Sequence, residues 1–220
     1  MKSLPQIHLQ RGRPYLLWLP VLILANAIVS EAAPIDEGLV DIKTIDPTIV
    51  VDLRYASPHN VTGHALYPAN MVALVQPGVA QRLVRAQNFL RKHHYGLKIW
   101  DAYRPQLAQE QLWQATHDGL YVADPLEGNG SLHTWGVAVD ATLVNAKGRD
   151  VSMPTDFDEF TPTALLRYQG QDASVKWHLK VLQVAMGRAG FYGMRTEWWH
   201  FVAYDWKKYA PIRDVKSSAQ

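Results

Sequence analysis

The chain has 220 residues, of which 48% are apolar and 19% charged, so it has room for one domain with a hydrophobic core. Its formal net charge is +2, but residues 1–32 hold three of the basic residues and one of the acidic ones. Residues 33–220 therefore carry 19 charges of each sign, a balance that argues against nucleic acid as a partner. Because the sequence has no cysteine, it excludes disulfides, and any metal must be held by His, Asp and Glu.

The N-terminus has the composition of an export signal. Basic residues occur before position 14, an apolar run covers residues 15–29, and small residues follow around Ala32. This order is typical of a secretory signal, and the run is shorter than the roughly 20 residues that span a bilayer. We predict a signal peptide over residues 1–32 and an exported, periplasmic protein without stable membrane insertion after cleavage. The alternative is an uncleaved signal that anchors the chain in the membrane.

The rest of the chain predicts helices and strands in irregular order. Apolar residues at helical spacing occur in three segments: 79–90, 105–117 and 173–188. Runs typical of strands occur in four: 49–53, 97–102, 137–143 and 198–202. Stretches rich in Gly, Pro, Asp or Asn predict loops over 57–70, 118–130 and 153–163. Since no βαβ unit repeats, we expect residues 33–220 to form one α+β domain with a small, mostly antiparallel sheet flanked by helices.

Two segments almost sixty residues apart contain candidate metal ligands. Residues 131–140 read SLHTWGVAVD, and residues 197–200 read EWWH. Two imidazoles and a carboxylate can hold one zinc ion and leave a position open for water, as in catalytic zinc sites. The three residues are His133, Asp140 and His200. Glu197 would then be a free carboxylate that can take a proton from the water. For any one histidine alone, the alternative is a hydrogen-bonded core or surface residue.

The spacing in each segment sets a geometric requirement. Seven residues of extended strand would separate His133 from Asp140 by more than about 20 Å, so both can bind one ion only if residues 134–136 turn back. Gly136 is well placed to permit such a turn. Glu197 and His200 are three residues apart and would lie on opposite faces of a straight strand. We therefore expect a bend at Glu197 and Trp198.

Five motifs follow one another between about residues 40 and 205. They are VDLRYASPHNVTG (51–63), WDAYRP (100–105), SxHx6D (131–140), Phe157-Asp158 and EWWH (197–200). In this order they resemble the D-alanyl-D-alanine dipeptidase family, the VanX-like zinc dipeptidases that are related to D,D-carboxypeptidases of peptidoglycan. Five motifs in the same order are far more specific than any one of them, and the matches are distributed over nearly all of residues 33–220.

The resemblance implies an enzyme of peptidoglycan metabolism that hydrolyses D-Ala-D-Ala, or a close D,D-dipeptide, to free D-alanine. It implies one zinc ion per chain in a cleft on the sheet, with His133, Asp140 and His200 as the ligands. Glu197 would be the general base that deprotonates the water and later protonates the leaving amine. Arg104 would stabilise the oxyanion of the tetrahedral intermediate, a task for which its fixed planar charge is suited.

The resemblance also implies a substrate site. Asp158 would meet the ammonium of the dipeptide, Ser131 would hydrogen-bond near it, and Tyr55 would line the site. From the residues alone, Asp158 is also typical of a solvated acidic loop, and Arg104 of an ion pair with Asp101 at the start of a helix. Both interpretations stay open at this point.

Two other functions share these motifs. A zinc D,D-carboxypeptidase or L,D-endopeptidase acting on longer peptidoglycan peptides would use the same metal site but would need an open cleft. A binding module without activity would often lack Glu197, which is present here. The expected partner is a small dipeptide, and the sequence leaves the oligomeric state open.

Overall fold

The computed structural model of the protein describes residues 38–212, so the predicted signal peptide over residues 1–32 lies outside the described residues. No helix in the described part is long and apolar enough to cross a membrane. The described strands are β1 (Val40–Asp41), β2 (Val50–Val51), β3 (Leu74–Val75), β4 (Tyr95–Asp101), β5 (Ala138–Asn145), β6 (Phe191–Gly193) and β7 (His200–Ala203). The described α-helices are α1 (Ile42–Ile45), α2 (Pro77–Arg91), α3 (Gln106–Thr116) and α4 (Ala173–Ala189).

The three long helices and the two long strands confirm the predictions to within a few residues. The strand expected over 49–53 is shorter, because β2 has two residues and the 3-10 helix Arg54–Ala56 follows it closely. The strand expected over 198–202 begins at His200, because Trp198 and Trp199 form a turn. The predicted loops are largely irregular.

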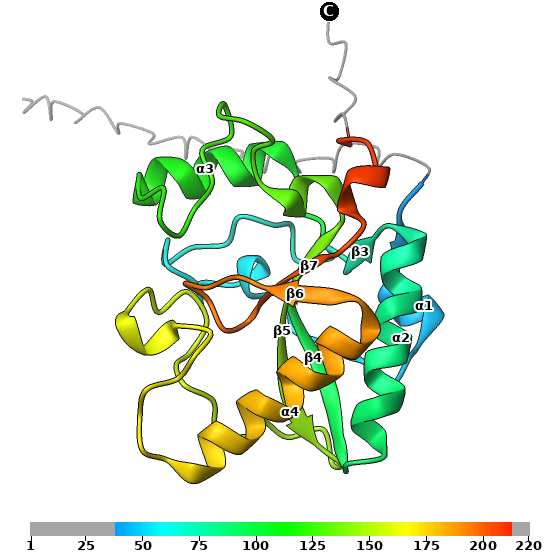
Figure 1. The fold of residues 1–220 in the computed structure, drawn as a ribbon. Coiled ribbons are helices and arrows are strands. Elements are labelled where there is room, and N and C mark those ends of the chain that lie inside the picture. Colours follow the sequence, from blue (N-terminus) through cyan, green and yellow to red (C-terminus); the bar gives the residue numbers. More distant parts are fainter. Residues whose placement is uncertain (1–37, 213–220) are drawn as a thin grey trace, which may run out of the picture. The chain divides into compact units, whose positions relative to one another are not determined.

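Five strands form the central sheet in the order β2-β4-β5-β7-β6 (Figure 1). Strand β2 is parallel to β4, and the other three pairs are antiparallel. A separate two-stranded sheet joins β1 to β3. The structure thus confirms an α+β domain with a small, mostly antiparallel sheet.

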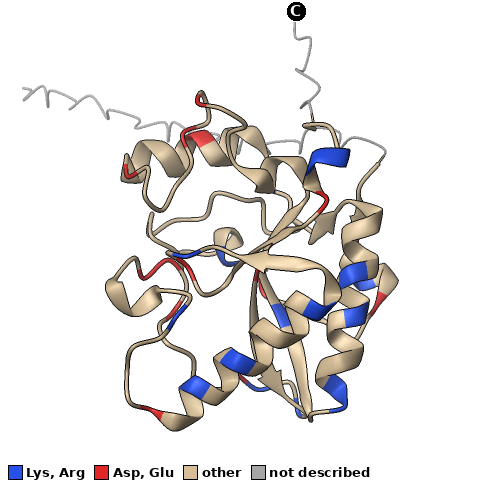
Figure 2. Cartoon of the chain, in the orientation of Figure 1, with Lys and Arg blue, Asp and Glu red and all other residues tan. Residues whose placement is uncertain are grey.

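Helices α2 and α4 pack against each other and against the central sheet (Figure 1). Each buries an apolar stripe with helical spacing: Val79, Leu83 and Leu90 in α2, and Val175, Leu179, Leu182 and Met186 in α4. Neither helix contains an acidic residue, whereas α2 contains Arg and α4 contains both Lys and Arg (Figure 2). The acidic side chains of the candidate site come instead from strands and loops.

An irregularity between β4 and β5 changes which residues face each other near the end of β4. Ile99 pairs with Ala141, but Asp101 pairs with Asp140, so Trp100 is an extra residue in β4. Such a β-bulge re-aims the side chains that follow it and is frequent beside active sites. Here it places Asp101, rather than Trp100, directly opposite Asp140.

Candidate functional site

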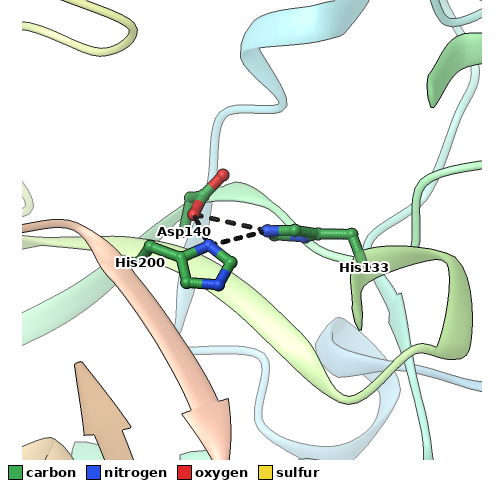
Figure 3. A group of neighbouring side chains, drawn as sticks. All are labelled: His133, Asp140 and His200. Carbon is green, nitrogen blue, oxygen red and sulfur yellow. Dashed lines mark hydrogen bonds and ion pairs between the residues drawn. The ribbon is translucent and has the colours of Figure 1, made fainter. Parts of the chain in front are cut away.

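The side chains of His133, Asp140 and His200 converge on one point (Figure 3). His133 Nε2, His200 Nδ1 and Asp140 Oδ1 form a triangle with sides of 3.1, 3.0 and 3.4 Å. The ligands of a tetrahedral zinc ion lie about 3.3 Å apart, since its bonds to nitrogen and oxygen are about 2.0–2.1 Å long. Both the donor set and the spacing of these residues therefore fit one zinc ion.

A tight turn brings His133 to this triangle. His133 lies in the 3-10 helix Leu132–Trp135, and Gly136 ends that helix in a left-handed conformation with φ of 66°. A Cβ atom on Gly136 would lie 2.7 Å from Leu39 Cδ2, so a side chain there would displace Leu39 in addition to straining the left-handed backbone. The chain turns back at Gly136 as the spacing of the ligands requires, and β5 then delivers Asp140.

The sheet positions the other two candidate ligands. Asp140 and His200 are direct neighbours across the antiparallel pair β5–β7, and side chains in that position lie close together. Trp198 and Trp199 form a turn just before β7, in which the His200 N–H donates to the Glu197 carbonyl. The predicted bend is thus present, and it leaves Glu197 Oε2 4.0 Å from His200 Nδ1, outside the triangle.

Hydrogen bonds behind the triangle orient His133. Its Nδ1 donates to the Ala102 carbonyl at 2.8 Å and lies 3.3 Å from Asp101 Oδ2. This leaves Nε2 as the nitrogen that faces Asp140 and His200. Histidine ligands of metals are generally held in this way, with the second nitrogen bonded to a carbonyl or carboxylate.

The triangle combines one carboxylate with two imidazoles, a donor set that binds a cation once both imidazoles are neutral. Burial lowers the pKa of His200, which favours the neutral imidazole that metals bind. Burial acts against ionisation of Asp140, but His133 and His200 outweigh it and hold the pKa of Asp140 below its usual range. Burial would also lower the pKa of His133, yet the neighbouring Asp140 raises it overall. The triangle thus holds one carboxylate charge among groups that are shielded from water.

Arg104 is buried beside the triangle and is held by an ion pair. Its Nε and Nη2 lie 3.0 and 2.7 Å from Asp101 Oδ2, and Nη2 lies 3.7 Å from Asp140 Oδ2. The guanidinium also lies over the Tyr55 ring, 4.8 Å from its centroid. The structure therefore contains the ion pair with Asp101 that was one of the two interpretations of Arg104. Arg104 also lines the cavity described below.

Asp158 is buried, with 8% of its surface exposed, so the interpretation as a solvated acidic loop is wrong. Its carboxylate accepts a hydrogen bond from the Tyr55 hydroxyl at 3.3 Å and one from the Val61 N–H at 3.2 Å. Its backbone has φ of 56°, a left-handed conformation that is uncommon outside glycine and often marks a functional position. Burial raises the pKa of Asp158 to about 7.

Glu197 is a second buried carboxyl group of the site. Burial raises its pKa well above the usual range, and the charges of Asp140 and Asp158 act in the same direction. Ser131 caps the 3-10 helix that carries His133, because its Oγ accepts a hydrogen bond from the His133 N–H at 3.3 Å.

One cavity of about 250 Å³ connects these groups. Every residue singled out from the sequence lines it: Tyr55, Arg104, Ser131, His133, Asp140, Asp158, Glu197 and His200. Apolar and aromatic side chains form the remaining walls, among them Leu112, Tyr121, Val122, Phe160 and Trp199. The structure thus brings the predicted residues together, while the roles of the individual residues stay predictions.

The sequence reasoning missed two residues of the site. Asp101 was expected only as an alternative partner of Arg104, but it also lies behind His133. Gln109 was not singled out, yet it is fully buried and bonds to Arg104. One signal was available: Gln109 lies on the buried face of α3 beside Ala108 and Leu112, where an amide is unusual.

Comparisons with known proteins identify the family of the chain. A family model described as D-ala-D-ala dipeptidase matches residues 36–218. The D-alanyl-D-alanine dipeptidase of Escherichia coli K12 is 34% identical over 163 residues, which cover 74% of this chain and 83% of that protein. The dipeptidase of the same name from Enterococcus faecium is 27% identical over 173 residues, covering 70% and 85%. A solved structure, the zinc complex of a mutant vancomycin resistance D,D-pentapeptidase VanY, is 15% identical in sequence. The match covers 61% of this chain and 75% of that chain. Its TM-score of 0.39 is too low to support an inference.

Proposed function

Because the chain belongs to the D-Ala-D-Ala dipeptidase family and is a zinc metallopeptidase, we propose that it hydrolyses D-Ala-D-Ala, or a close D,D-dipeptide, to free D-alanine. One observation carries this proposal. A single cavity joins a metal triangle, a free carboxyl group at Glu197, a cation at Arg104 and a buried carboxyl group at Asp158. These are the groups needed to hold a dipeptide by its amino end and to cleave its peptide bond.

His133, Asp140 and His200 would hold the zinc ion. When bound, zinc supplies a Lewis acid that polarises the scissile carbonyl and makes a water molecule more acidic. The protein contributes the geometry of these three side chains and a largely apolar cavity, in which electrostatic interactions are stronger than in water.

Glu197 is the proton carrier of the proposed reaction. Its carboxylate takes a proton from the attacking water and passes it to the nitrogen of the departing D-alanine. Its raised pKa makes the carboxylate a stronger base for the first of these transfers. Its position near His200, but outside the triangle, leaves Glu197 free for this task.

Arg104 stabilises the negative charge that develops on the carbonyl oxygen. Its Nε and Nη2 donate to Asp101 and its Nη1 donates to Gln109, and the guanidinium also lines the cavity. Because the guanidinium is already oriented in the buried site, it reorganises little when the charge forms.

Asp158 binds the ammonium group of the dipeptide in this proposal. The Tyr55 hydroxyl holds the Asp158 carboxylate from one side, and Ser131 lies in the same cavity. A buried carboxylate forms an ion pair with a free ammonium and so stabilises a bound dipeptide. A longer peptide would bring an uncharged amide to the same place and leave the carboxylate without an oppositely charged partner. This preference favours a dipeptidase over a carboxypeptidase or endopeptidase that acts on longer peptides.

A substrate panel tests the proposal. The zinc-loaded enzyme should release D-alanine from D-Ala-D-Ala and should be at least about a hundredfold less active on N-acetyl-D-Ala-D-Ala, in which the charge that meets Asp158 is removed. L-Ala-L-Ala serves as the stereochemical control. Equal or faster cleavage of the acetylated compound, or of a pentapeptide stem, would favour the alternative function on longer peptides.

We further propose that the enzyme is exported and acts in peptidoglycan turnover in the periplasm. The basic and apolar order of residues 1–29 supports this location, with membrane anchoring by an uncleaved signal as the alternative. Cell fractionation and N-terminal sequencing of the native protein test it. A mature chain that starts near residue 33 in the soluble periplasmic fraction is expected, and an intact N-terminus in the membrane fraction would contradict cleavage.

A further inference from the structure

Gln109 bonds to the site at both ends of its side-chain amide. It lies on α3 and is fully buried. Its Oε1 accepts a hydrogen bond from Arg104 Nη1 at 2.8 Å, and its Nε2 donates one to the Ala123 carbonyl at 2.7 Å. Ala123 belongs to the loop over residues 118–130, and both Ala123 and Arg104 line the cavity. Gln109 therefore links the arginine of the site to a wall of the cavity.

Packing alone does not explain a glutamine at this position. A buried amide is costly unless its hydrogen bonds are made, and a leucine of similar size would fill the space without that cost. The neighbours of Gln109 on the buried face of α3 are Ala108 and Leu112, which are apolar. The orientation of the amide follows from its partner, because a guanidinium only donates and so faces the amide oxygen.

Arg104 is held from two directions. Asp101 binds Nε and Nη2, and Gln109 binds Nη1. Asp101 holds one edge of the guanidinium and the Tyr55 ring lies against its face, while Gln109 adds the hydrogen bond at Nη1. The second N–H of Nη1 then keeps a fixed direction.

We propose that Gln109 is a positioning residue that fixes the guanidinium of Arg104 for the charge that develops during hydrolysis. This inference rests on the proposed function, in which Arg104 stabilises the oxyanion. Gln109 does not touch the substrate in this scheme and acts through Arg104. Its loss should lower kcat more than it changes KM, because the oxyanion exists only beyond the ground state.

Kinetics of Gln109→Leu, with Gln111→Leu as a matched control, test the proposal. Gln111 lies on the same helix and is exposed. For Gln109→Leu we expect unchanged zinc content, a kcat about 10- to 100-fold lower and a KM within about threefold of the wild type. Gln111→Leu should behave like the wild type. If Gln109→Leu fails to fold, Gln109→Met, which is unbranched and of similar length, replaces it. A kcat unchanged in the folded variant would overturn the proposal.

A double-mutant cycle separates positioning from a general structural effect. If Gln109 acts through Arg104, then Gln109→Leu should cost less than about threefold in kcat when introduced into Arg104→Ala. The same 10- to 100-fold loss in both backgrounds would mean that the two residues act independently, and it would contradict the proposal.

An NMR measurement without substrate keeps this inference distinct from the proposed function. In the wild type, the Arg104 Nη1 hydrogens should exchange positions slowly and give separate side-chain signals, assigned by their absence in Arg104→Lys. In Gln109→Leu these signals should average. Averaged Nη1 signals in the wild type would overturn the positioning role, whichever dipeptide the enzyme cleaves. A wild type that cleaves no D,D-dipeptide yet shows separate signals would overturn only the proposed function.

Discussion

Asp101 and Asp140 lie directly opposite each other on β4 and β5, and the guanidinium of Arg104 serves both carboxylates. Its Nη2 is 2.7 Å from Asp101 Oδ2 and 3.7 Å from Asp140 Oδ2. The β-bulge at Trp100 produces this pairing. The sheet thereby places the Asp140 carboxylate, a predicted metal ligand, beside the Arg104 guanidinium, and Asp101 holds that guanidinium at the end of β4.

Asp101→Asn should destabilise the protein. The substitution removes a fully buried charge and leaves Arg104 with only its more distant carboxylate, so we expect a loss of about 3 kcal/mol in the free energy of unfolding. Urea denaturation measures it. Asp52→Asn is the control, because Asp52 pairs with Arg54 and Lys98 while its side chain is 44% exposed, and it should cost less than about 1 kcal/mol. Similar losses in the two variants would show that burial of the Asp101 pair has no special effect.

His200→Ala should abolish metal binding. Removing one corner of the triangle leaves two ligands, which is one fewer than a catalytic zinc site uses. After dialysis, metal analysis should find one zinc ion per chain in the wild type and less than about 0.1 in the variant. His178→Ala is the control, since His178 bonds to the Ser152 carbonyl and is not part of the triangle. Full zinc content in His200→Ala would place the metal elsewhere.

Gly136→Ala should weaken zinc binding as well as stability. The left-handed backbone costs about 1–2 kcal/mol for alanine, and the new methyl group would collide with Leu39. Relaxation of the strained backbone at position 136 would shift the turn that holds His133. Gly148→Ala has a similar φ of 73° but meets no atom within 4 Å, so it should lose stability without losing zinc affinity. Titration of both variants with zinc distinguishes them, and equal affinities would contradict the role of the turn.

The KM for D-Ala-D-Ala should depend on pH through Asp158. Burial raises its pKa to about 7, and only the carboxylate form attracts the ammonium of the substrate. KM should therefore rise about tenfold for each pH unit below 7. It should also rise above about pH 8, where the amine of the dipeptide loses its proton. The groups that face Asp158 are Tyr55, Arg104, Asp140 and Glu197.

Asp158→Asn is the matched variant for this pH dependence, because it keeps the shape and removes the charge. It should raise KM and flatten the acidic side of the profile, while the alkaline side stays. An acidic side that is unchanged in Asp158→Asn would show that another group titrates there.

Much of the fold follows from local patterns. Helices α2 and α4 have apolar stripes with a period that only a helix fits, and Gly190 ends α4 with φ of 95°, as the glycine there predicts. The bend before His200 and the turn at Gly136 follow from a simple requirement, namely that ligands distant along the chain must meet. The number of residues between two ligands therefore predicts where the chain must turn, even when the rest of the structure is unknown.

The remaining features depend on contacts that no local pattern contains. The bulge at Trp100 depends on how β4 pairs with β5, so the sequence did not predict that Asp101 faces Asp140. The burial of Asp158 depends on Tyr55 and Val61, which lie about a hundred residues earlier in the chain. The role of Gln109 likewise depends on its contacts with Arg104 and Ala123, which only the folded chain brings together.

The most direct test of the proposed mechanism is the turnover of D-Ala-D-Ala by Glu197→Gln at equal zinc content. Glutamine keeps the size of the side chain but cannot carry the proton, and Glu197 lies outside the metal triangle. We expect the variant to retain one zinc ion per chain and to lose at least about a thousandfold in kcat. Turnover within about tenfold of the wild type, with zinc fully bound, would contradict the assignment of Glu197 as the proton carrier.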